Sequence, residues 1–370
     1  GPNSTAVPGP YKATPIVVEG IMYIPTSFGR VVALDAQSGE ARWVFDTRAW
    51  EAGRPANLGY NTRGVAYWEG SGKRRIFFAT NDSYLWALDA ETGQVDSAFG
   101  DGGRVDLSQG LGREINKRDY GVVSPVLVTN NKVIVNSIVN DAPASLETPP
   151  GHVRAFNPET GALEWMFETI PQAGEFGNET WEDGSWEYTG STNAWTIMSA
   201  DDELGIAYIP IGTPTNDWYG GMRKGDNLFA ESLVAVDVNT GERIWHFQMI
   251  HHGIWDYDPP AAPNLIDITV AGRDIKAVAQ VTKQGFVYTF DRATGEPVWL
   301  LEERQVPQAP TIPGERLSPT QPFPTRPPAF EKQGLSIDDL IDFTPELRAE
   351  AIEIVSEYTY GPLYTPTTLT

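Results

Sequence analysis

The sequence contains no cysteine, which excludes disulfide scaffolds, thiolate metal sites and cysteine nucleophiles. It also has no apolar run that approaches ~18 residues, the length that a membrane-spanning helix requires. Positive charge is scarce, because 27 Lys and Arg stand against 49 Asp and Glu and give a formal net charge of −22. Binding to phosphates needs clusters of Lys and Arg. We therefore expect neither a membrane span in this chain nor a nucleic-acid partner.

Glycine and proline, by contrast, are abundant, with 36 and 29 residues in a chain of 370. Turn-forming residues at this density argue against a helical bundle and favour many short elements joined by turns. The chain is 41% hydrophobic and 11% aromatic and holds 12 tryptophans, so it has ample material for a buried core.

A pattern of the form A-x-D-x-x-x-G-x-x-x-W recurs along the chain. Four copies carry the tryptophan and a fifth lacks it: ALDAQSGEARW ends at Trp43, AFNPETGALEW at Trp165, AVDVNTGERIW at Trp245, TFDRATGEPVW at Trp299, and ALDAETGQVDS at Ser97. Each copy predicts two strands joined by a turn, in which the Asp or Asn side chain caps the turn and the Gly supplies a positive φ.

The spacing of the repeat predicts an all-β fold, a β-propeller. Its acidic position recurs about every 64 residues on average, which suits a four-stranded antiparallel sheet with a long loop. The tryptophans, at a constant offset from the glycine, are expected to dock neighbouring sheets against each other. We therefore expect about five blades of four strands each.

A different region follows the last repeat. Residues 307–328 carry eight prolines and predict an extended crossing segment. Ser336 and Thr344 are expected helix N-caps, with a short amphipathic helix from Pro345 to about Ser356. The predicted organisation is propeller blades at 1–306 and a Pro-rich and helical insertion at 307–370 that leads to a truncated end.

Residues typical of a reactive site gather in the segment IHHGIWDYDPP, which follows the fourth copy of the repeat, the one that ends at Trp245. Asp256 by itself would more often be a turn or helix cap than a catalytic residue. Asp258 is expected to cap the Pro259–Pro260 turn, with a ligand for a larger cation as the alternative. His251 and His252 are interpreted as supports of the loop rather than metal ligands. Two further segments accompany this one, STNAW at residues 191–195 and KQG at residues 283–285.

Together these segments resemble the quinoprotein dehydrogenases that use pyrroloquinoline quinone (PQQ), and within them the membrane glucose dehydrogenase branch. The resemblance extends from about Thr14 to Thr370 and includes TPIVVEGIMYIPT, RGVAYWE, RRIFFATNDSYLWALDAETG, HHxxWDxDxPA, and VPQ followed by PTQPF. It implies an eight-bladed propeller, of which this chain covers about five blades. The related alcohol dehydrogenases carry an adjacent cysteine pair, and its absence favours the sugar and polyol branch.

The resemblance implies a role for each matching residue. Asp256 matches the general base that takes the proton of the substrate hydroxyl. Trp195 matches the aromatic floor under the planar quinone, with Asn193 in the same segment assigned to cofactor binding. Lys283 matches the cation that hydrogen-bonds the quinone oxygens. Arg63 matches an active-site arginine that pairs with a carboxylate of the cofactor.

A metal ion is also implied, usually Ca²⁺, with another divalent or a larger cation as the alternative. The expected ligands are Asn140, Asp141, Thr215 and Asp256. The branch usually has Asp-Asn where this chain has Asn140-Asp141. Gly59 stands where the branch has a histidine, four residues before the arginine.

The expected reaction is PQQ-dependent oxidation of a sugar, polyol or cyclic alcohol by hydride transfer to the quinone, with electrons passed to a quinone-type acceptor. A quinate or other polyol dehydrogenase of the same family is one alternative, and a non-catalytic propeller for binding or assembly is the other. The family implies a periplasmic parent protein, with or without a membrane anchor, although the chain shows no targeting segment. A fragment of an eight-bladed protein and a closed five-bladed ring both remain open.

Overall fold

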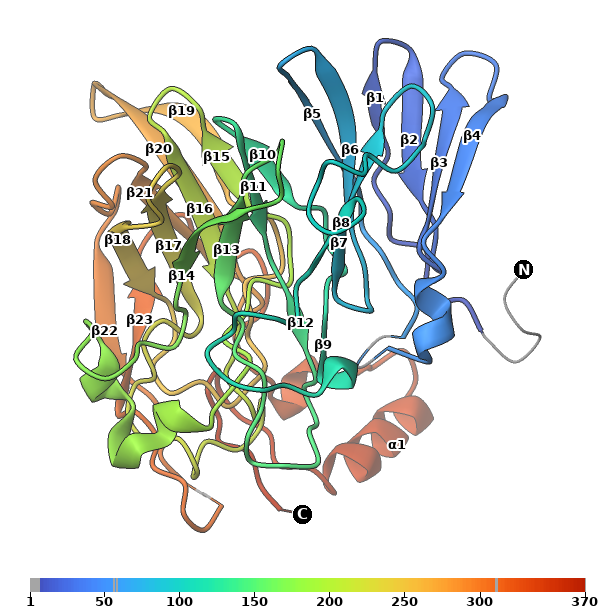
Figure 1. Cartoon of the computed structure of the whole chain (residues 1–370). Coiled ribbons are helices and arrows are strands. Elements are labelled where there is room, and N and C mark those ends of the chain that lie inside the picture. Colours follow the sequence, from blue (N-terminus) through green and yellow to red (C-terminus); the bar gives the residue numbers. More distant parts are fainter. Residues whose placement is uncertain (1–6, 56, 58, 310–311, 370) are drawn as a thin grey trace.

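The computed structural model describes residues 7–55, 57, 59–309 and 312–369. These residues form a series of antiparallel sheets that lie side by side in an arc (Figure 1), from β1–β4 at one side to β19–β21 at the other. The first strands of neighbouring sheets, β5, β10, β15 and β19, contact one another along this arc.

In the described residues, four sheets have four strands each, connected in chain order or nearly so. Their strands are β1 (Ile16–Val18), β2 (Ile21–Pro25), β3 (Arg30–Asp35) and β4 (Ala41–Asp46); β5 (Ala66–Gly70), β6 (Lys73–Ala79), β7 (Tyr84–Asp89) and β8 (Arg104–Asp106); β10 (Leu127–Thr129), β11 (Lys132–Val135), β13 (Val153–Phe156) and β14 (Leu163–Phe167); and β15 (Ser199–Asp201), β16 (Ile206–Ile211), β17 (Ser232–Asp237) and β18 (Arg243–Gln248). This architecture confirms the predicted propeller fold class.

The fifth sheet has three strands among the described residues, β19 (Asn264–Val270), β20 (Arg273–Val281) and β21 (Val287–Asp291). Its fourth strand is reduced to a single bridge between Phe290 and Pro297. Pro297 stands where β14 and β18 begin with Leu163 and Arg243, and proline has no N–H to donate to a ladder.

Smaller elements complete the fold. Two-stranded pairs are formed by β9 (Tyr120–Gly121) with β12 (Ile138–Val139), and by β22 (Leu301–Gln305) with β23 (Thr320–Pro324); the 3₁₀ helices are η1 (Ala49–Ala52), η2 (Lys117–Asp119), η3 (Asn178–Thr180), η4 (Glu182–Glu187) and η5 (Ile337–Asp339). The β22–β23 ladder was not expected, since β23 lies in the Pro-rich segment. It joins residues on both sides of the predicted boundary at 306/307, and the division into domains stays a prediction.

The repeat turns have the predicted chemistry. Asp35 Oδ1 accepts hydrogen bonds from the backbone N–H groups of Gln37 and Ser38 at 3.1 and 3.0 Å, and Gly39 has φ 75°. The same capping bonds occur in the other four copies, at Asp89, Asn157, Asp237 and Asp291.

The tryptophans dock neighbouring sheets at three junctions, as predicted. Trp43 Nε1 donates to the carbonyl of Ala90 in the next sheet at 3.1 Å, and a Cβ on Gly93 would lie 2.5 Å from the Trp43 ring. Only glycine therefore allows this close approach. The equivalent bonds join Trp165 to Val238 and Trp245 to Arg292.

Each pair of neighbouring sheets shares one buried apolar cluster. Because side chains alternate along a strand, β6 contributes Phe77 to the cluster with the third sheet and Ile76 and Phe78 to the cluster with the first. Burial of both faces thus binds each inner sheet to both of its neighbours.

Helix α1 (Pro345–Val355) begins where it was expected, because Thr344 Oγ1 accepts a hydrogen bond from Leu347 N at 3.2 Å. Ser336 caps η5 in a capping box with Asp339. No residue of α1 is buried. Across the described residues, every helix is too short or too polar to cross a membrane.

Candidate active site

A cavity of about 420 Å³ brings together side chains that lie far apart in the sequence. Six of the eight predicted site residues line it: Arg63, Asp141, Asn193, Trp195, Asp256 and Lys283. They come from different sheets and from the loops between them, so the fold assembles them into one site. The roles assigned to them remain predictions.

Asp256 and Lys283 form the closest charged pair of the cavity. Asp256 lies in the loop that follows β18, and Lys283 lies in the tight turn between β20 and β21, which Thr282 closes by hydrogen bonds to Phe286. Lys283 Nζ donates to Asp256 Oδ1 at 2.9 Å and to the Asp256 carbonyl at 2.6 Å. The lysine therefore holds both the side chain and the backbone of the aspartate.

The pKa of Asp256 is raised to about 6, chiefly by burial and then by the neighbouring Asp258 carboxylate, while Lys283 partly offsets both. Its side chain is still 36% exposed, so a ligand in the cavity can reach it. A carboxylate with a pKa near neutrality is suited to accept a proton from a substrate.

Trp195 presents its ring to two cations. The Arg63 guanidinium carbon lies 4.9 Å from the ring centroid and Lys283 Nζ lies 5.9 Å from it. Arg63 Nη1 is buried without a hydrogen-bond partner, and burial lowers the pKa of Arg63. A flat anion on the Trp195 ring would give this guanidinium an acceptor, which is the fit expected for the planar, carboxylate-bearing PQQ.

Asn193 is fixed from behind the cavity. Its Nδ2 donates to the carbonyl of Ser137 at 2.7 Å. A Cβ on Gly151 would lie 2.2 Å from the Cβ of Asn193, so Gly151 allows the two segments to pack closely. The preceding Ser191 and Thr192 both have positive φ, which turns the chain so that Asn193 and Trp195 reach the cavity together.

The predicted metal ligands are only partly brought together. Asp141 and Asp256 line the cavity, but Asn140 and Thr215 do not. Asn140 Nδ2 instead donates to Asp119 Oδ1 at 2.8 Å, and Thr215 Oγ1 lies 3.4 Å from Thr148 Oγ1. In the described part of the chain, no three His, Asp or Glu side chains form a group that could hold a metal ion. The metal shell therefore stays a prediction.

The acidic side chains in and around the cavity nevertheless repel one another, which favours a bound cation. Burial raises the pKa of Asp141 to about 7, and repulsion from Asp258 and Asp256 adds to the effect. Burial likewise raises the pKa of Asp217 to about 9, with repulsion from Asp141, and that of Glu231 to about 8, with repulsion from Asp258. A bound cation would relieve this repulsion and keep the carboxylates ionised.

Three polar residues of the cavity were not predicted as site residues: Lys12, Asn57 and Asp258. Asp258 does not cap the Pro259–Pro260 turn. Its Oδ1 accepts the Thr213 N–H at 2.5 Å and its Oδ2 lies 3.4 Å from Lys283 Nζ. Although burial opposes ionisation, Lys283 and Thr213 hold the pKa of Asp258 below its usual value. The position of Asp258, two residues after Asp256, was the feature of the sequence that could have indicated it as a site residue.

The sheets and the cavity define a β-propeller protein with a cavity lined by charged side chains and a tryptophan. The chain belongs to the family described as PQQ: glucose/ethanol/alcohol dehydrogenase, beta-propeller domain, whose sequence model matches residues 2–370.

Its relatives include quinoprotein glucose dehydrogenase A of Acinetobacter calcoaceticus, 32% identical over 336 residues, which cover 84% of this chain and 41% of the relative. Quinate/shikimate dehydrogenase (quinone) of Acinetobacter baylyi is 30% identical over 362 residues, which cover 90% of this chain and 43% of the relative. The solved structure of a quinohemoprotein alcohol dehydrogenase from Pseudomonas putida is similar with a TM-score of 0.66 and 34% identity, covering 79% of this chain and 42% of that one. The chain thus spans roughly two fifths of the length of these relatives.

Proposed function

We propose that this chain carries the catalytic site of a PQQ-dependent dehydrogenase that oxidises a sugar, polyol or cyclic alcohol. The observation that carries the proposal is the Asp256–Lys283 pair beside the Trp195 ring, with the unpartnered Arg63 Nη1 on the same ring. This chemistry requires a base, a positively charged side chain that favours the ionised form of that base, and a surface on which a flat anion can stack.

Four residues would hold the cofactor. Trp195 supplies the stacking face, Arg63 and Lys283 supply positive charge, and Asn193 supplies an amide on the cavity wall. When bound, PQQ supplies a quinone that accepts a hydride from the alcohol carbon. A cation, Ca²⁺ or another divalent or larger ion, would sit against the carboxylates of Asp141 and Asp256, with Asn140 and Thr215 as the further predicted ligands.

Asp256 takes the hydroxyl proton of the substrate. Loss of that proton raises the electron density on the oxygen and favours departure of the hydride from the same carbon. Lys283 favours the ionised form of the Asp256 carboxylate and so partly offsets burial and the charge of Asp258. The two electrons and one proton leave the substrate as hydride, and the second proton leaves through Asp256.

Reconstitution tests this function directly. The chain is incubated with PQQ and Ca²⁺, and oxygen-independent reduction of an artificial dye is followed with glucose, glycerol and quinate as substrates. We expect turnover that needs both additions and is lost when a chelator removes the cation. Absence of both saturable PQQ binding and turnover would leave the non-catalytic propeller as the better description.

A quinate or related cyclic polyol dehydrogenase is the second candidate. It is supported by the 30% identity to quinate/shikimate dehydrogenase (quinone), and the same substrate panel distinguishes it from a glucose dehydrogenase. The relatives are bacterial enzymes, and we propose a periplasmic place and a quinone-type electron acceptor for the parent protein. Reduction of a soluble ubiquinone analogue in place of the dye tests the acceptor.

A further inference from the structure

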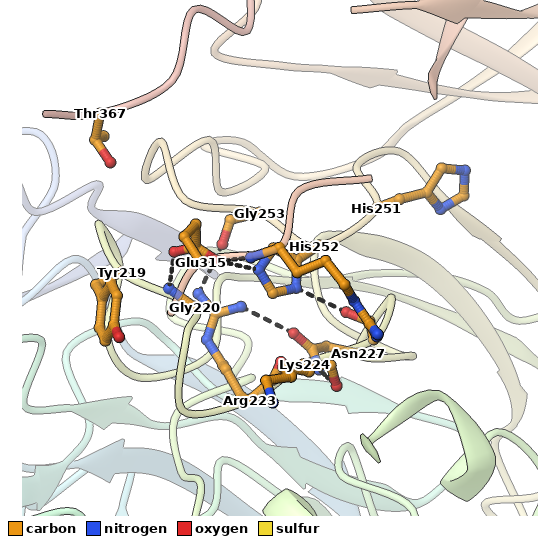
Figure 2. A network of polar contacts seen from close by, with 12 residues as sticks. Tyr219, Gly220, Arg223, Lys224, Asn227, His251, His252, Gly253, Glu315 and Thr367 are labelled. Carbon is orange, nitrogen blue, oxygen red and sulfur yellow. Dashed lines mark hydrogen bonds and ion pairs between the residues drawn. The ribbon is translucent and has the colours of Figure 1, made fainter. Parts of the chain in front are cut away.

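The Pro-rich segment places one carboxylate, that of Glu315, between Gly220 and His252 (Figure 2). The side chains of Glu315 and His252 are each 1% exposed, and Glu315 Oε1 lies 2.6 Å from His252 Nε2. Glu315 Oε2 accepts a hydrogen bond from the backbone N–H of Gly220 at 2.6 Å. One carboxylate therefore joins the Pro-rich segment to the loop around Gly220 and to the loop that carries Asp256.

His252 is held through both of its ring nitrogens. Nδ1 lies 2.8 Å from the carbonyl oxygen of Gly225, and Nε2 faces the Glu315 carboxylate. Both partners are hydrogen-bond acceptors, so the two contacts fix the position and the orientation of the imidazole ring. Because both side chains are almost fully buried, the contact between them is stronger than the same contact would be at the surface.

Arg223 holds the next residue of the same loop. Its guanidinium is 1% exposed and donates to the carbonyl of Gly253 at 2.7 Å and to Asn227 Oδ1 at 2.9 Å. The side chain therefore ties the backbone at Gly253 to the loop that contains Gly220 and Asn227 (Figure 2).

Two glycines pack closely against side chains around this segment. A Cβ on Gly220 would lie 2.4 Å from His252 Nε2, and a Cβ on Gly253 would lie 1.5 Å from Glu231 Oε2. Both glycines are therefore required by close contact with a neighbouring side chain.

The backbone from His252 to Asp256 needs such support. Both residues have positive φ, at 50° and 53°, a conformation that costs a non-glycine residue ~1 kcal/mol or more. Between them, Ile254 is fully buried and Trp255 Nε1 donates to the carbonyl of Thr365 at 2.8 Å. The strained segment persists because these contacts hold it.

We propose that Glu315 is a positioning residue: through His252 and Gly220 it fixes the backbone of residues 252–256, and thereby the place of the Asp256 carboxylate opposite Lys283. This inference rests on the proposed function in one respect, the role of Asp256 as the base. Glu315 itself does not line the cavity of the site.

The chain offers a matched control for the test. Glu303 pairs with the preceding histidine, His251, at 3.2 Å, but its side chain is 52% exposed and lies on β22. The variants Glu315→Gln and Glu303→Gln therefore remove the same charge from adjacent His–Glu pairs, one buried and one exposed.

Two measurements are made on both variants and on the unaltered chain. Hydrogen–deuterium exchange of the amides of residues 252–256, without cofactor, is expected to rise about tenfold in Glu315→Gln and to stay within twofold in Glu303→Gln. With PQQ and Ca²⁺, kcat is expected to fall about tenfold in Glu315→Gln, with KM and the Kd for PQQ within twofold, because Arg63 and Trp195 are untouched.

The outcomes separate the two proposals. An unaltered chain that neither binds PQQ nor turns over overturns the proposed function, while the exchange data still decide whether Glu315 fixes the loop. Unchanged exchange and a kcat within twofold in Glu315→Gln overturn the positioning role. If Glu315→Gln does not fold, Glu315→Asp, which keeps the charge but withdraws it by one methylene, must show the same exchange and kcat changes. Native values in a folded Glu315→Asp would overturn the inference.

Discussion

Arg75, on β6, donates a hydrogen bond to the backbone carbonyl of Pro158 in the next sheet. Pro158 directly follows the turn-capping Asn157, just as the carbonyls that accept from Trp43, Trp165 and Trp245 directly follow the capping aspartates of their turns. An arginine thus makes the docking bond at the one junction whose repeat, Ala87 to Ser97, lacks the tryptophan. The acceptor is at all four junctions the carbonyl that follows the capping residue, whereas the donor at this junction comes from β6 and not from the strand after the turn.

Replacing Arg75 by methionine should destabilise the protein by about 2–4 kcal/mol. The change removes the bonds to Pro158 and Glu159 and leaves Asp96, whose side chain is only 20% exposed, without its buried partner. Urea unfolding measures the difference. The control is Arg74→Met, since Arg74 is 52% exposed and its ion pair with Glu19 is expected to contribute at most ~1 kcal/mol. Equal losses in the two variants would refute the docking role of Arg75.

Replacing Asp256 by asparagine should lower kcat at least about 100-fold, because the amide cannot accept the hydroxyl proton. PQQ binding should change little, since Trp195 and Arg63 remain. Dye reduction and a PQQ titration give both values. Asp267→Asn, which alters a side chain that is 75% exposed, is the control. Turnover that survives in Asp256→Asn would exclude Asp256 as the base.

Replacing Trp195 by alanine should weaken PQQ binding at least about tenfold, since the stacking surface and the face shared by Arg63 and Lys283 are lost. Trp195→Phe should lose less, because a smaller aromatic face remains. Quenching of the remaining tryptophan fluorescence on PQQ addition measures the Kd. Trp218→Ala removes a tryptophan that is 51% exposed and serves as the control. A Kd unchanged in Trp195→Ala would contradict the stacking role.

His152 should make the protein less stable as the pH falls below ~6.5. Burial and the charges of Arg113 and Arg154 lower the pKa of His152 to about 3, and its Nδ1 accepts the N–H of Thr169 at 3.2 Å. The unfolded chain binds a proton at this histidine below ~6.5, whereas the native chain does not. From pH 7 to pH 5 this costs about 2 kcal/mol of unfolding free energy.

The variant His152→Gln isolates that contribution in urea unfolding at the two pH values. Its loss of stability between pH 7 and pH 5 should be smaller than that of the unaltered chain by about 2 kcal/mol. Identical slopes in the variant and in the unaltered chain would show that His152 binds its proton as readily in the native state as in the unfolded chain.

The sequence predicted the residues of the candidate site that lie in distinctive segments and whose chemistry follows from their residue type. Asp256, Lys283, Trp195 and Arg63 meet at one cavity, as the resemblance implied. The metal ligands were less predictable, because oxygen ligands leave no spacing pattern. Asn140 is bound to Asp119, 21 residues away in the chain, and no local rule reveals which of two adjacent side chains turns toward the cavity.

By itself, the sequence determined the features whose partners lie within a few residues. Asp35 caps its turn through N–H groups two and three residues ahead, and Thr344 caps α1 three residues ahead, so the pattern contains the whole interaction. The tertiary structure alone decided the features whose partners are remote. Arg75 lies 83 residues from Pro158 and His252 lies 63 residues from Glu315. Such contacts depend on how the sheets and loops pack in three dimensions, and side-chain spacing along the chain carries no information about them.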